Sequence, residues 1–139
     1  MRLISILSII VYLVGCKTDS SILEFSRSLS TSIVGQWVWV KTRNAWTGKF
    51  TTPDDLGYTL VEEFAVDSTL ATYKDGILDK ERQYYVVYSD STKTRSEGML
   101  YIINESSAYF TIENDELITS AAFVDGPTIY YRRLKIGLF

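Results

Sequence analysis

The stretch that decides the fold is residues 98–126, GMLYIINESSAYFTIENDELITSAAFVDG. It contains runs of β-branched and aromatic residues, which favour strands. Polar turns separate these runs at residues 104–106 (Asn-Glu-Ser) and 113–116 (Glu-Asn-Asp-Glu), and the last run ends at Asp125 and Gly126. Such clusters are typical of tight turns. We therefore predict three antiparallel strands joined in series by hairpins.

The same pattern continues on both sides of this stretch. The eight predicted strands are residues 34–43, 58–66, 69–73, 80–88, 98–103, 108–112, 117–124 and 127–136. Short strands joined mostly by hairpins, with no helix signal between them, favour an all-β, antiparallel, up-and-down barrel, since closure leaves no exposed strand edge. A flattened sandwich with the same strand order is the alternative, because apolar residues on both faces blur the alternation in several strands.

Alternation also predicts which side chains face the core. The predicted inward sets are Leu60, Phe64 and Val66; Met99, Tyr101 and Ile103; and Ala108, Phe110 and Ile112. Trp37 and Trp39 share a face, which favours core packing over a role as a platform for ligand stacking. Glu62 shares the face of Leu60 and Phe64, so we expect it either near a barrel mouth or buried and paired with Arg132.

The N-terminus is typical of an export signal. Residues 3–14, LISILSIIVYLV, are uncharged, follow Arg2 and fall short of the roughly 20 apolar residues that a membrane-spanning helix needs. The junction Leu-Val-Gly-Cys at residues 13–16 resembles the lipobox of bacterial lipoproteins. That resemblance implies acylation of Cys16 and anchoring in a membrane, and Lys17 favours the outer membrane of the cell envelope.

These observations divide the chain into three parts. Residues 1–15 are the predicted lipoprotein signal peptide, residues 16–32 a Ser- and Thr-rich tether that could include a short helix, and residues 33–139 the barrel domain.

Composition excludes several classes of function. The chain has no histidine and one cysteine, which excludes imidazole catalysis and an internal disulfide. The formal net charge is −3 with no strongly basic stretch, so no nucleic-acid partner is expected. Acidic clusters such as residues 113–116 lack the spacing of a calcium loop, and no metal or cofactor is predicted. Because only carboxylates, Tyr, Lys and Arg remain to do chemistry, we do not expect an enzyme.

Motifs at both ends of the predicted barrel resemble a known family. Gly35 and Trp37 resemble the Gly-x-Trp of lipocalins, and residues 130–133, Tyr-Tyr-Arg-Arg, resemble the last strand of that fold, where an arginine packs over the tryptophan. On this resemblance we expect Arg132, more than Arg133, to close the barrel with Gly35 and Trp37.

A more detailed resemblance is to the lipocalin-like domain of Bacteroidetes lipoproteins. It rests on Trp39 after the Gly-x-Trp motif, on Thr-Thr-Pro at residues 51–53 between Gly48 and Gly57, and on a Phe-x-x-Asp turn at residues 64–67. Ser68 departs from the glycine usual there. The resemblance implies the architecture and an envelope location, and it implies no activity.

Two hypotheses for the function follow. In the first, the barrel binds a small apolar or amphipathic molecule, or a glycan segment, under the loop of residues 44–57, where Trp46 and Phe50 are the candidate contacts. In the second, the barrel is filled and the protein docks to an envelope partner. A cavity of about 300 Å³ or more beneath that loop would favour the first hypothesis.

Overall fold

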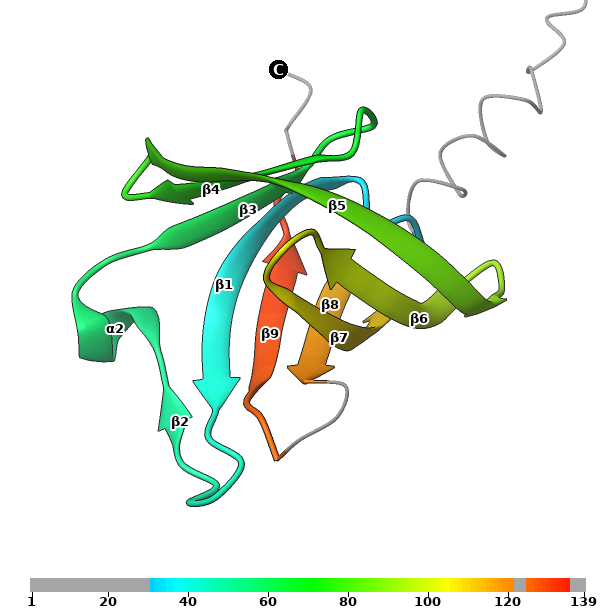
Figure 1. Ribbon diagram of the computed structural model, residues 1–139. Coiled ribbons are helices and arrows are strands. Elements are labelled where there is room, and N and C mark those ends of the chain that lie inside the picture. Colours follow the sequence, from blue (N-terminus) through cyan, green and yellow to red (C-terminus); the bar gives the residue numbers. More distant parts are fainter. Residues whose placement is uncertain (1–30, 122–124, 136–139) are drawn as a thin grey trace, which may run out of the picture.

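The protein is a closed antiparallel β-barrel, as the sequence predicts (Figure 1). The computed structural model describes residues 31–121 and 125–135, and every structural statement below concerns those residues. The predicted signal peptide, Cys16 and nearly all of the predicted tether lie outside them. No helix within the described ranges has the length and apolar character needed to cross a membrane.

Nine strands and one short helix make up the described part of the chain. They are β1 (Gly35–Arg43), β2 (Phe50–Thr51), α2 (Pro53–Leu56), β3 (Leu60–Phe64), β4 (Thr69–Lys74), β5 (Ile77–Ser91), β6 (Arg95–Ile102), β7 (Ser106–Glu113), β8 (Glu116–Ala121) and β9 (Thr128–Arg133). Eight of these strands, all except β2, follow one another around the barrel in chain order. The eight predicted strands correspond to these eight, with shifted ends.

Strand β1 closes the barrel by pairing with both β3 and β9. Trp37 has Glu62 opposite it on one side and Arg133 on the other. A sandwich would leave these edges unpaired, so the pairing of the first and last strands excludes that alternative.

The loop that we predicted at residues 44–57 has structure of its own. It turns back so that β2 pairs with the end of β1, and α2 follows. The Asp55 carboxylate accepts hydrogen bonds from both the backbone N–H and the hydroxyl of Thr52, each 2.8 Å long, which fixes the first turn of α2. Gly57 then ends the helix with a left-handed φ of 73°.

One hydrophobic core lies inside the barrel. Its fully buried large side chains are Trp37, Phe64, Phe110, Ile33, Leu70, Ile112 and Leu117. The inward orientation predicted for Leu60, Phe64, Phe110 and Ile112 is confirmed, whereas Val66 lies in the turn after β3 and is exposed.

The inward face that we predicted for β6 is wrong. Ser96, Gly98 and Leu100 are buried, whereas Met99 and Tyr101 lie on the other, partly exposed face and Ile103 is exposed beyond the strand. Both faces of this strand carry large apolar residues, so the pattern alone could not orient it. At Gly98 strand β6 approaches β5 closely, because a Cβ there would lie 2.1 Å from the carbonyl oxygen of Val87.

Arg133 closes the end of the barrel where β1 begins. Its guanidinium carbon is 4.0 Å from the centroid of the Trp37 indole, and its Nη1 and Nη2 donate to the carbonyl oxygens of Val34 and Ser32 at 3.1 and 2.7 Å. Our preference for Arg132 was therefore wrong. Arg132 is the register partner of Val38 and is exposed, because alternation turns it outward while Arg133 faces the interior.

Candidate functional site

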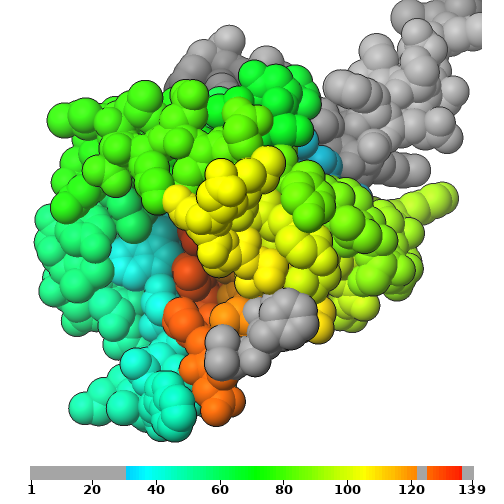
Figure 2. All heavy atoms as spheres, in the orientation of Figure 1, coloured from blue at the N-terminus to red at the C-terminus, as the bar shows by residue number. Residues whose placement is uncertain are grey.

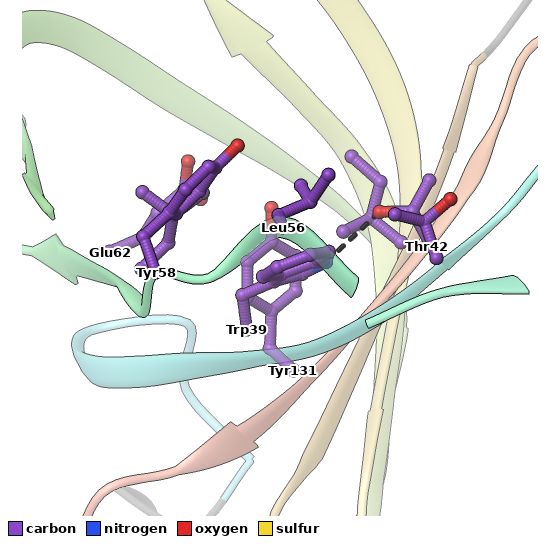
Figure 3. A pocket seen from close by; sticks show the side chains of 9 residues that line it. Trp39, Thr42, Leu56, Tyr58, Glu62 and Tyr131 are labelled. Carbon is purple, nitrogen blue, oxygen red and sulfur yellow. Dashed lines mark hydrogen bonds between the residues drawn. The ribbon is translucent and has the colours of Figure 1, made fainter. Parts of the chain in front are cut away.

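A pocket of about 410 Å³ opens at the opposite end of the barrel, the mouth, where β1 ends and β3 begins. Its lining residues are Trp39, Thr42, Thr51, Leu56, Tyr58, Leu60, Glu62, Ile129 and Tyr131. They come from β1, β3 and β9, from β2 and α2, and, in the case of Tyr58, from the turn between α2 and β3 (Figure 3). Figure 2 shows a recess on this side, with atoms of β1 and β9 visible inside it. The cavity that the first hypothesis requires is present.

Aromatic rings form one wall of the pocket. Trp39 and Tyr58 lie with their ring centroids 6.4 Å apart and their planes inclined by 28° (Figure 3). The indole N–H of Trp39 donates to the Thr42 hydroxyl at 2.9 Å, which fixes the ring against β1. A flat, preordered aromatic wall of this kind suits the apolar or ring-shaped part of a ligand.

Glu62 contributes a charged group to the same pocket. Its side chain is 18% exposed, and Arg82 Nη2 lies 3.4 Å from its Oε1. Burial raises the pKa of the Glu62 carboxyl above its usual value, and the nearby Arg82 guanidinium and Tyr131 hydroxyl offset only part of that shift. The carboxylate is thus incompletely stabilised by the protein's own partners.

Tyr131 is the second polar group at the base of the pocket. The ring is 7% exposed, and its hydroxyl hydrogen-bonds with Glu62 and with the Thr119 side chain. Burial raises the pKa of Tyr131 well above its usual value, and the neighbouring Glu62 carboxylate adds to the effect. Tyr131 therefore remains a neutral hydrogen-bond donor, and it orients the Glu62 carboxylate.

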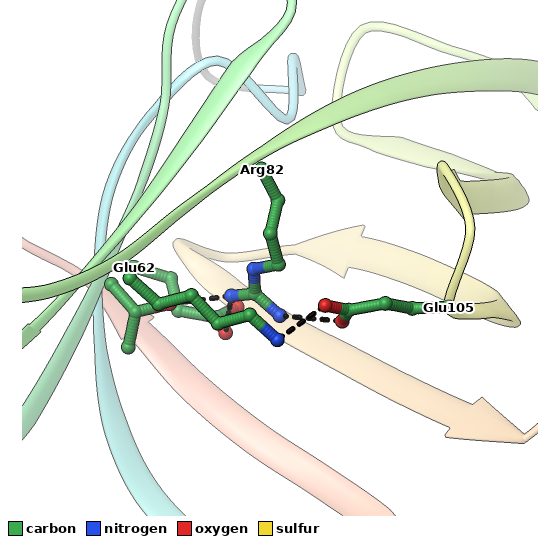
Figure 4. A network of polar contacts seen from close by, with 5 residues as sticks. Glu62, Arg82 and Glu105 are labelled. Atoms are coloured by element: carbon green, nitrogen blue, oxygen red, sulfur yellow. Dashed lines mark hydrogen bonds and ion pairs between the residues drawn. The ribbon is translucent and has the colours of Figure 1, made fainter.

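A polar network links Glu62 to the rim of the barrel (Figure 4). Arg82 on β5 also donates to the Thr72 hydroxyl, and its Nη1 lies 3.4 Å from Oε2 of Glu105. Glu105 in turn pairs with Lys80. Arg82 consequently shares its charge between two carboxylates, which leaves less of it to neutralise Glu62.

The residues that we predicted for a ligand site lie outside this pocket. Trp46 is 82% exposed, at the tip of the loop between β1 and β2. Phe50 is half exposed on β2, where its ring lies 6.3 Å from Tyr130 and 4.8 Å from Lys41 Nζ, measured to the ring centroids. The loop does cover the mouth, but it contributes Thr51 and Leu56.

Sequence reasoning located part of the pocket and missed the rest. Trp39 and Glu62 were both on the predicted inward face, and Glu62 does lie near the mouth. Its charged partner is Arg82, and our expectation of Arg132 was wrong because Arg132 points away from the interior. No sequence pattern marks Tyr58 as a pocket residue. Arg82 could have been predicted to face the interior, because it alternates with Tyr84 on one face of β5.

The described ranges contain no group of three or more carboxylate or cysteine side chains arranged to hold a metal ion. Comparisons of the chain with models of protein families, with curated proteins and with solved structures find no match.

Proposed function

We propose that this protein binds a small amphipathic molecule in the mouth pocket of its barrel. The observation that carries the proposal is that one pocket of about 410 Å³ combines an aromatic wall, at Trp39 and Tyr58, with the partly buried carboxylate of Glu62. Pockets for small ligands are concave, mostly apolar, and carry a few fixed polar groups. The mouth pocket has each of these properties.

The structure also bears on the alternative of a filled barrel. Packing is complete at the closed end, where Trp37 is fully buried beneath Arg133. The mouth end remains hollow, although large side chains such as Leu60 and Ile129 point toward it. A barrel whose only task is to support an outer docking surface gains stability from filling this space, since unfilled apolar volume costs free energy.

The membrane anchor remains part of the proposal. We propose that Cys16 is acylated and holds the ligand-binding barrel at the envelope, in accordance with the resemblance to lipoproteins. In cells supplied with a radiolabelled fatty acid, the parent chain should take up label and a Cys16→Ala variant should not. Equal labelling of the two would contradict the anchor.

Ligand binding can be tested with a pair of matched variants. Leu60 lines the pocket, and its neighbour Val61 on β3 points to the other face of the strand. Leu60→Trp should fill the pocket, whereas Val61→Trp adds the same indole outside it. Native mass spectra of the three proteins, purified from the native host, should show a small bound molecule on the parent and on Val61→Trp alone.

The proposal fails if the parent carries no bound molecule, or if Leu60→Trp retains it. Circular dichroism and thermal melting of all three proteins show whether the barrel has formed, so a misfolded variant is not mistaken for an empty one.

A further inference from the structure

The residues that line the mouth pocket carry charge of one sign. Among the described residues that line it, Glu62 alone is charged, and the other polar groups are hydroxyls and the Trp39 indole. The indole N–H is already donated to Thr42. An anionic ligand would therefore meet a carboxylate and find no lysine or arginine in the lining to receive it.

Glu62 has capacity for a further partner. A carboxylate has about four acceptor positions, and the protein supplies Arg82 at 3.4 Å on one oxygen together with the Tyr131 hydroxyl. The Arg82 contact is long for a charge-assisted hydrogen bond, which is typically about 2.7–2.9 Å. A ligand that donates hydrogen bonds to Glu62 would complete its coordination.

The aromatic wall favours the same sign of ligand charge. The faces of tryptophan and tyrosine rings carry negative electrostatic potential and attract cations. The structure already shows this on Tyr58, where Lys74 Nζ lies 4.1 Å from the ring centroid. Lys74 is exposed at the rim and is not among the residues that line the pocket.

We infer that the mouth pocket takes an organic cation, a compact apolar or aromatic amine whose body lies against Trp39 and Tyr58 and whose ammonium group donates to Glu62. This inference rests on the proposed function and specifies its ligand class. A fatty acid or another carboxylate would place like charges together and should bind less tightly than an amine.

Three probes with one body and different head groups test the inference: phenethylamine, phenethyl alcohol and phenylacetate. Titration calorimetry of the full chain at neutral pH should rank them in that order of affinity. We expect phenethylamine to bind at least about tenfold more tightly than the alcohol, because it alone supplies a charge to a partly desolvated carboxylate. Phenylacetate should bind most weakly.

The variants Glu62→Gln and Glu63→Gln form the matched control. Glu63 is the next residue on β3 and hydrogen-bonds with Gln36 at 3.1 Å, outside the pocket. Glu62→Gln should abolish the preference of the protein for the amine over the alcohol. Glu63→Gln should retain it.

The outcomes separate this inference from the proposed function. Equal or tighter binding of the alcohol or of phenylacetate by the unaltered protein overturns the inference, as does a preference that persists in Glu62→Gln. Failure of all three probes to bind also overturns it. The proposed function is tested separately by native mass spectrometry. It requires that the parent binds a small molecule of any charge and that Leu60→Trp does not.

Discussion

Arg133 lies directly over Trp37, with its guanidinium carbon 4.0 Å from the centroid of the indole. The pairing joins the last barrel strand to the first, and Arg133 also holds the carbonyl oxygens of Ser32 and Val34. Gly35 makes room for it: its φ of +132° is rare for other residues, and a Cβ there would lie 3.0 Å from Arg133 Nη1. Arg133 is therefore the residue that seals the closed end.

Replacing Arg133 with alanine should lower the free energy of unfolding by about 2–4 kcal/mol, because it removes the cation–π contact and leaves the carbonyl groups it holds without their donor. Arg132→Ala, on the outer face of the same strand, should change it by less than about 1 kcal/mol. Urea unfolding followed by circular dichroism measures both. Equal losses in the two variants would mean that the register of β9 is wrong.

Gly98 lets strand β6 pack closely against β5. The added methyl of Gly98→Ala would lie 2.1 Å from the Val87 carbonyl oxygen, a backbone atom, so the strands must separate. We expect Gly98→Ala to lower the free energy of unfolding by about 1–3 kcal/mol. Gly57→Ala is the control. A methyl group there would meet no atom within 4 Å and only the backbone φ is strained, so this variant should lower the free energy of unfolding by about 1 kcal/mol. A Gly98→Ala protein as stable as the parent would contradict the close approach of β6 to β5.

The sequence predicted those parts of the fold that depend on local pattern. The strands, their hairpins and the closing role of Gly35 and Trp37 follow from alternation, turn residues and motif. The choice between Arg132 and Arg133 does not follow from local pattern. A shift of one residue along a strand turns every side chain to the other face, and the register of β9 depends on its pairing with β1. The prediction of which face of β6 points inward was wrong for a related reason, since that face depends on contact with β5.

The pocket was harder to predict than the barrel. The length and aromatic content of the loop at residues 44–57 pointed to the correct end of the molecule, but Trp46 and Phe50 face away from the cavity. The pairing of Glu62 with Arg82 joins residues on strands that are not neighbours in the barrel, which no local pattern encodes. Only the closed barrel brings them together.

Glu62 should make the stability of the protein depend on pH. Burial raises the pKa of its carboxyl above the usual 4.5, so the folded protein holds the proton more tightly than the unfolded chain. Stability due to this group is therefore highest below the unfolded pKa and falls as pH rises through the folded pKa. The unfolding free energy of the parent, minus that of Glu62→Gln, should decrease as the pH rises above the usual carboxyl pKa of 4.5. A difference that is flat or rises with pH would contradict the burial of Glu62.

Trp46 should be dispensable for both folding and pocket binding. Since it is 82% exposed and outside the pocket, Trp46→Ala should change the free energy of unfolding by no more than about 0.5 kcal/mol. It should also remove most of the tryptophan fluorescence that acrylamide quenches, because Trp37 and Trp39 are buried. Loss of the bound molecule from Trp46→Ala, with the fold intact, would place the ligand on the loop instead of in the pocket.

The most direct test of ligand binding in the mouth pocket is a crystal structure of the protein purified from its native host, at a resolution that shows individual side chains. The account predicts electron density for a small molecule against Trp39 and Tyr58, with a donor atom within hydrogen-bonding distance of Glu62. Side chains collapsed into the space between Trp39 and Tyr131, or a bound molecule elsewhere on the barrel, would contradict it.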